Sequence, residues 1–286
     1  MGDGDMYAVW IDGTDIEGSE YTEGAWTGGG EVEGWLEDWG NRIEITVSNT
    51  NIDSNLTHFP VLLTIGGSVG TSSNDITAVF DELGSKSQKI AVTKSDGTSQ
   101  IYAEIETWDN SGEKAWLWVS SSDLTLSSSA TTTLYLYYDS AKDDNTTYIG
   151  NTNSSAAEAV WDSNFLAVHH FGATSGTYYA STSINNDSTS VAVTNRTANS
   201  SCRVGNCPEF NGSANVIYLT ENNTLDLTNN FTIQATVELD TYDSMYPSIL
   251  EKSIDSSYAF YAGGSNQLWL ENYDVDMYGN SNSNAL

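Results

Sequence analysis

The chain has 286 residues, of which 39 are acidic and 9 basic, so its formal net charge at pH 7 is −30. This acidic excess excludes a protein that binds nucleic acid through its phosphates, because such a surface needs clustered lysine and arginine. Hydrophobic residues make up 38% of the chain and aromatic residues 11%, which excludes a disordered chain. Short β-rich runs between turn signals, without long helical periodicity, predict an all-β protein.

Residues 1–40 are predicted to form an extended N-terminal arm that attaches the protein to a partner. The segment combines a glycine-rich stretch with four tryptophans: Trp10, Trp26, Trp35 and Trp39. Glycines let the backbone turn, while indole rings lie over a neighbouring surface. We expect the arm to bury these rings against another chain. For Trp35 and Trp39 the alternative is that they cover the edge of the next domain.

The chain begins with MGDGDMYAVWIDGTD, which has neither the basic region nor the apolar region of a signal peptide. No apolar run reaches the roughly 18 residues that a membrane helix needs. A surface-type β-protein without an export signal is expected to be assembled inside a cell and released with it, as virion components are. A leader that has been removed is the competing explanation.

Residues 41–150 are predicted to form the first antiparallel β-sandwich. Six strands are expected: Arg42–Val47, Val61–Ile65, Lys89–Lys94, Ile101–Trp108, Lys114–Val119 and Thr133–Tyr138. The segments NRIEITVSN, LTHFPVLLTI, YAEIETWD, AWLWV and LYLYYDSA, in this order, resemble a widespread domain of unknown function. That domain commonly precedes laminin-G-like modules in bacterial, archaeal and viral surface proteins. The resemblance brings no established activity with it.

Residues 151–286 are predicted to form a second antiparallel sandwich. Alternation from Phe231 to Val237 has the period of a half-buried strand, and a further strand is expected at Leu166–Phe171. The entry WDSNF and the hairpin Pro208–Leu239 resemble the laminin-G-like, concanavalin A-like jelly rolls. The resemblance implies a jelly-roll fold whose rim can hold calcium through Asp, Asn and carbonyl oxygens. The residues that would bind calcium are not identified by it.

The second sandwich is expected to be incomplete. After the expected strands Tyr258–Ala262 and Gln267–Leu270, the segment Asn272–Leu286 is polar and irregular. An open sandwich leaves unpaired strand edges. Either the polypeptide continues or identical neighbours complete the sheet, so a homo-oligomer is expected, with a trimer favoured.

Two pairs of titratable residues are candidates for catalysis. His169 and His170 are adjacent in an expected strand and should point to opposite faces, which does not suit one catalytic pocket. Glu104 and Glu106 should share one face of a strand, as two acids do in jelly-roll glycosidases. Chance pairs are expected among 39 acids, however, and no second catalytic motif accompanies this one. The sequence therefore favours a protein that is not an enzyme.

Two further sets of residues were assigned roles. Sugars stack on exposed aromatic rings at jelly-roll rims, which makes four late residues glycan-binding candidates: Tyr242, Tyr246, Trp269 and Tyr273. For Trp269 the alternative is a place in the core. Cys202 and Cys207 are separated by a short turn that can bring them together as a disulfide under oxidising conditions.

The leading hypothesis from these patterns is a virion surface protein, such as a tail fibre, spike or capsid decoration. Its partners would be other virion proteins and host-surface glycans or proteins. The alternative is a secreted or cell-wall adhesin of a bacterium or archaeon, and the third class is a carbohydrate-active enzyme.

Overall fold

The protein is described by a computed structural model. The structure describes these residues: 35–36, 38–193, 195–196, 202–220, 223–227, 230–238, 248–252, 258–263, 267–272 and 277–280. They fall into two compact units. The first unit lies within Tyr7–Ser188 and Arg196–Pro208, and the second within Thr189–Asn195 and Glu209–Leu286. The expected boundary at residues 150/151 differs from this division, because residues 151–188 pack with the first unit.

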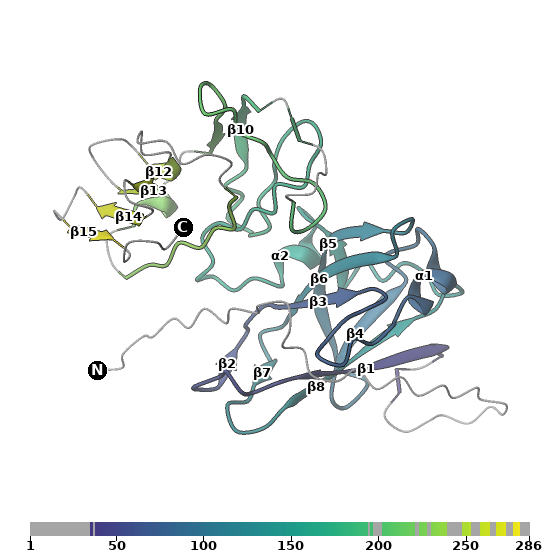
Figure 1. The fold of residues 1–286 in the computed structure, drawn as a ribbon. Coiled ribbons are helices and arrows are strands. Elements are labelled where there is room, and N and C mark those ends of the chain that lie inside the picture. The colour runs from purple at the N-terminus through teal and green to yellow at the C-terminus, as the bar shows by residue number, and fades with distance from the viewer. Residues whose placement is uncertain are drawn as a thin grey trace. The chain divides into compact units, whose positions relative to one another are not determined.

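The first unit is built on a curled β-sheet (Figure 1). Its strands are β1 (Asn41–Val47), β3 (Val61–Ile65), β4 (Ile90–Lys94), β5 (Gln100–Asp109), β6 (Lys114–Ser120), β8 (Thr132–Tyr138) and β9 (Ile149–Asn151). Their order is β1-β8-β4-β5-β6-β3, with β9 parallel to β5 and the other pairs antiparallel. Two short strands, β2 (Leu56–Thr57) and β7 (Thr125–Leu126), form a separate pair. The all-β prediction is confirmed, and the six expected strands are present.

Alternation places the core on one side of each strand. In β3 every second residue is buried, beginning at Val61, and in β6 the buried series is Ala115, Leu117 and Val119. Side chains from both halves of the curled sheet meet in one apolar core, as in a β-sandwich. The opposite faces of β5 and β6 do not contribute to this core and are available for contacts with other segments of the unit.

The helix α1 (Ala78–Leu83) closes one side of this core and was not predicted. Its Val79, Phe80 and Leu83 are buried. Gly84 ends the helix with a positive φ of 57°, a conformation that glycine adopts without strain. Six residues are too few to display helical periodicity in a sequence.

Residues 152–188 contain the short helix α2 (Ser155–Glu158) followed by mostly irregular chain. The expected strand at Leu166–Phe171 is wrong, since these residues form no β-ladder. The chain here is held by side-chain contacts, and Phe171 adopts a positive φ of 55°, which a strand does not accommodate.

The second unit contains two small sheets in its described part. The strands are β10 (Ser188–Val191), β11 (Ile217–Leu219), β12 (Ser248–Lys252), β13 (Tyr258–Gly263), β14 (Gln267–Asn272) and β15 (Met277–Asn280), with a 3-10 turn η1 at Asn223–Leu225. β10 pairs with β11, and β12-β13-β14-β15 form an antiparallel meander.

Two expectations for the second unit are corrected. Phe231–Val237 lies in no β-ladder, although its alternation predicts a strand. An alternating pattern supplies a strand only where a partner edge is available to bond with it. The segment after Asn272 is not wholly irregular, because β15 pairs with β14. No helix in the described ranges has the length and apolar character needed to cross a membrane.

Candidate functional site

The site forms on the outer face of β5, opposite the core. Ile101, Ala103 and Ile105 point inward, so Glu104 points outward. The pairing with β6 shifts after Ile105, which leaves Glu106 as an extra residue in a β-bulge. Glu106 follows Glu104 by two residues and therefore shares its face, and the bulge adds the next residue, Thr107, to the same side. The two carboxylates share a face, as the alternation of the sequence predicts.

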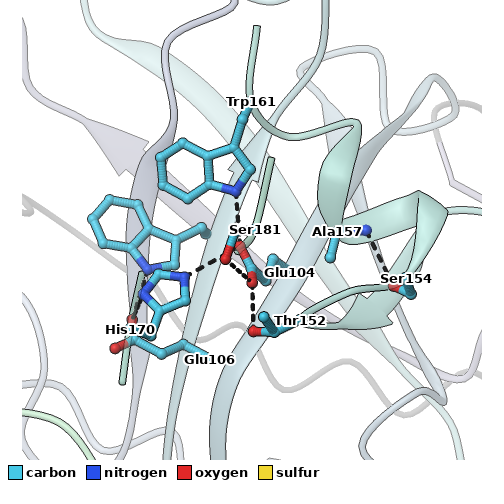
Figure 2. A network of polar contacts seen from close by, with 9 residues as sticks. Glu104, Glu106, Thr152, Ser154, Ala157, Trp161, His170 and Ser181 are labelled. Atoms are coloured by element: carbon cyan, nitrogen blue, oxygen red, sulfur yellow. Dashed lines mark hydrogen bonds and ion pairs between the residues drawn. The ribbon is translucent and has the colours of Figure 1, made fainter. Parts of the chain in front are cut away.

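The segment after β9 covers this face. Ser154 caps the N-terminus of α2, and its Oγ accepts a hydrogen bond from the backbone N–H of Ala157 at 3.3 Å. Four residues around and beyond this helix reach the carboxylates: Thr152, Trp161, His170 and Ser181 (Figure 2). Only Glu104, Glu106 and His170 were singled out from the sequence.

Glu104 is fully buried and has contacts on both carboxylate oxygens. Its Oε1 accepts hydrogen bonds from Thr152 Oγ1 and Ser181 Oγ, both at 2.6 Å. Its Oε2 accepts one from Trp161 Nε1 at 2.8 Å and lies 3.3 Å from His170 Nε2. Burial alone would raise the pKa of Glu104, but His170, Ser181 and Thr152 outweigh it and lower the pKa below its ordinary value.

His170 lies between the two carboxylates. Its Nδ1 is 3.4 Å from Glu106 Oε2, and its Nε2 has the ion-pair distance to Glu104 without the alignment of a hydrogen bond. The contact with Glu104 is an ion pair. Burial by itself lowers the pKa of His170, but the carboxylates outweigh burial and raise this pKa to about 10. At neutral pH the imidazolium thus sits between two acidic side chains.

Indole rings enclose the charged group. Trp118 donates from Nε1 to Glu106 Oε2 at 2.6 Å, and its ring stacks on His170 with centroids 6.0 Å apart. Trp161 packs against both, at 5.3 Å from Trp118 and 6.1 Å from His170. Cations are attracted to the faces of aromatic rings, so these indoles stabilise the imidazolium while they exclude water.

This arrangement is suited to holding the covering segment on the sheet. A glycosidase needs one carboxyl group to protonate the leaving oxygen and another to attack or activate water, with the sugar between them. Here His170 occupies the space between the carboxylates, and internal donors engage Glu104 on both oxygens. The geometry provides no place for a sugar between Glu104 and Glu106.

His169 has separate surroundings. Its Nε2 lies 3.1 Å from the backbone oxygen of Asn186, and its ring stacks on Phe171. Burial lowers the pKa of His169, so the ring is neutral at neutral pH. The two histidines therefore lie in different surroundings, although the chain around them is not a strand.

The arm residues that the structure describes pack within the chain. Trp35 and Trp39 place their ring centroids 5.9 and 6.3 Å from that of Tyr137, which is fully buried. The guanidinium of Arg42 lies 4.4 Å from the ring centre of Trp35. These contacts agree with the alternative in which both tryptophans cover the sandwich. Trp10 and Trp26 lie outside the described residues.

Of the glycan-binding candidates, only Trp269 falls within the described residues. It lies on β14 opposite Tyr261 of β13, and the two rings are nearly parallel with centroids 6.4 Å apart. Tyr242, Tyr246 and Tyr273 lie outside the described residues. The structure joins Cys202 and Cys207 in a disulfide. No group of three or more His, Cys, Asp or Glu side chains in the described part of the chain is arranged to hold a metal ion.

Sequence patterns do not assign four of the residues that contact the carboxylates to this site: Thr152, Trp118, Trp161 and Ser181. Their roles depend on how an irregular segment folds over β5, and hydroxyl residues are too common in this chain to be distinctive. The one available signal was the alternation of Trp116 and Trp118 on β6, which places Trp118 on the outer face beside the glutamates.

Comparisons with known proteins identify no relative. No family model matches the chain, and neither a curated protein nor a solved structure does.

Proposed function

We propose that this chain is a non-catalytic structural protein displayed on a surface, specifically that of a virion, as a tail fibre, spike or capsid decoration. The observation that supports this most is the state of the Glu104–His170 pair. The cluster that most resembles catalytic machinery is buried, and its charged groups contact one another. Such a cluster serves the fold rather than turnover.

Charge supports a displayed position. A net charge of −30 keeps a protein soluble at high local concentration and repels nucleic acid. The sequence resemblance to domains of bacterial, archaeal and viral surface proteins points the same way. An adhesin of a cell wall shares both properties, and the two proposals differ in where the protein resides.

Location distinguishes these two proposals directly. Antibodies raised against the recombinant chain would be used for immunogold labelling of purified particles and of cell envelopes from the same culture. Labelling of intact particles that co-purifies with their major capsid protein is the expected result. Labelling confined to cell envelopes would contradict the virion proposal and favour the cell-wall adhesin. If neither particles nor envelopes were labelled, surface display itself would be contradicted.

Attachment to host glycans is the second part of this proposal. The Tyr261–Trp269 pair on β13 and β14 supplies adjacent aromatic rings, the kind of group on which sugars stack. A glycan array with and without calcium would compare the wild type with Trp269→Ala, using Trp116→Ala in the first unit as the control. Binding lost only in Trp269→Ala is expected. If the wild type bound no glycan, the attachment part of the proposal would be wrong and the protein would have a purely structural role.

A further inference from the structure

A seam separates the outer face of β5 from the segment that covers it. On one side of the seam lie Glu104 and Glu106, and on the other lies His170. All three belong to the first compact unit. Anything that contacts both sides next to these residues will affect how readily the seam opens.

The loop closed by the Cys202–Cys207 disulfide belongs to the same unit. Gly205, inside this loop, has a φ of 53° and lies against β5 so closely that an added Cβ would be 2.7 Å from Thr107 Oγ1. The neighbouring Asn206 donates from Nδ2 to the backbone oxygen of Gly172 at 3.1 Å. The loop therefore touches two segments that are distant in the sequence.

These two contacts lie on opposite sides of the seam. Thr107 directly follows Glu106 and pairs opposite Trp116 after the bulge, so it lies on the outer face of β5. Gly172 is two residues beyond His170 in the covering segment. The disulfide loop thus bridges the strand and its cover beside the ion pairs that already join them.

We propose that this loop is a redox-dependent clasp, which holds the seam closed when Cys202 and Cys207 are joined and releases it when they are reduced. The contacts that dock the loop include the hydrogen bond from Asn206 and the close backbone approach of Gly205. Docking a free loop also costs conformational entropy, because each of its residues must be ordered. The disulfide restricts the loop before it docks, so the oxidised loop docks more readily than the reduced one.

The chemistry is thiol–disulfide exchange with an external thiol or disulfide. In release, an external thiolate attacks one sulfur and forms a mixed disulfide, and a second external thiolate displaces the remaining cysteine. Two protein thiols and one external disulfide result, and closing follows the reverse path. The inference does not depend on virion location, because it concerns contacts within one unit.

Indole N–H groups measure the state of the seam. Trp118 donates to Glu106 next to the clasp, whereas Trp108 donates to the backbone oxygen of Gly84 at 2.8 Å beside α1. In the ¹⁵N-labelled full chain, solvent exchange of the Trp118 indole should become roughly tenfold faster on reduction, with Trp108 unchanged. The double variant Cys202→Ser/Cys207→Ser should match the reduced wild type. Equal Trp118 rates in the oxidised and reduced wild type would overturn the clasp.

A second variant separates docking from the disulfide itself. Gly205→Ala keeps both cysteines but places a methyl group against Thr107, so it should speed Trp118 exchange while mass spectrometry shows the disulfide intact. Gly212→Ala is the matched control, because Gly212 also has a positive φ, of 68°, but has no neighbour within 4 Å. Protection of Trp118 that survives in oxidised Gly205→Ala would overturn the proposal, even if the serine double variant failed to fold.

Discussion

His170 Nε2 lies 3.3 Å from Oε2 of Glu104, a carboxylate whose side chain is completely inaccessible to solvent. Removing such charges from water is costly, and their attraction offsets the cost only when the remaining polar atoms also have partners. Thr152, Ser181 and Trp161 provide those partners for Glu104. The pair therefore holds the covering segment in one arrangement.

Glu104→Gln should destabilise the first unit by about 3 kcal/mol, because removing one partner of a buried pair leaves the other charge uncompensated. The new amide would also direct its N–H₂ group at donors from Thr152 and Ser181, or from Trp161. Urea unfolding followed by tryptophan fluorescence would measure the free energy of unfolding. Glu113→Gln, at an exposed turn, is the control and should leave it unchanged. A loss below 0.5 kcal/mol in Glu104→Gln, about the size of a surface effect, would contradict this account.

Stability should fall as the pH rises from about 6.5 to 10, because His170 keeps its proton up to about 10 when folded but loses it near 6.5 when unfolded. The native state then binds the additional proton, so one group contributes a decline of at most about 1.4 kcal/mol per pH unit. Other groups titrate in this range, so the difference between the wild type and His170→Gln isolates the effect. Parallel pH profiles for the two proteins would show that His170 titrates normally.

The contribution of Glu104 to stability depends on pH with the opposite sign: it decreases as the pH falls. Its folded pKa lies below the ordinary value of 4.5, so its contribution is present above 4.5 and is lost as the pH falls through the folded pKa. Unfolding measured between pH 5 and 2 should therefore show a steeper loss in the wild type than in Glu104→Gln. A variant that loses stability as steeply as the wild type would count against a depressed pKa.

The sequence predicted the strands of residues 41–150 because one side of each faces a single core, and burial of alternate residues imposes a period of two. The same period placed Glu104 and Glu106 on one face. It did not predict that His170 reaches them, because residues 159–187 form neither helix nor strand and so leave no periodic signal. The strand prediction for Leu166–Phe171 failed because its apolar residues are held by aromatic contacts, such as that of Phe171 with Tyr178, and not by pairing with another strand.

The tryptophans of residues 1–40 should separate into two functional groups. Trp35→Ala combined with Trp39→Ala should lower the stability of the first unit by on the order of 1–3 kcal/mol, because Tyr137 loses the rings that cover it. Trp10→Ala with Trp26→Ala should leave thermal unfolding unchanged but reduce incorporation into particles. Normal incorporation of the second pair would contradict an attachment role for these two residues.

We predict that the protein forms a homo-oligomer, with a trimer expected. β12–β15 form a meander whose outer strands each have one pairing partner among the described residues, and such edges recruit further strands. Light scattering coupled to gel filtration would give the mass in solution. The charge of −30 opposes association, so the measurement should be made at both low and high salt. A folded monomer of these 286 residues at high salt would exclude strand sharing.

The bulge at Glu106 places two consecutive side chains of β5 on the outer face of the strand. Before it, Ile105 faces the apolar core, and beyond it Trp108 returns to that core by packing on Phe80 at 5.0 Å, while Glu106 and Thr107 serve the opposite side. Deleting this one residue would restore unbroken pairing with β6 and leave Thr107 and Trp108 on their present faces, but it would remove the carboxylate that lies beside His170 Nδ1 and accepts from Trp118 Nε1. A single inserted amino acid thus adds a charged side chain to the outer face while Ile105 and Trp108 keep their places in the core.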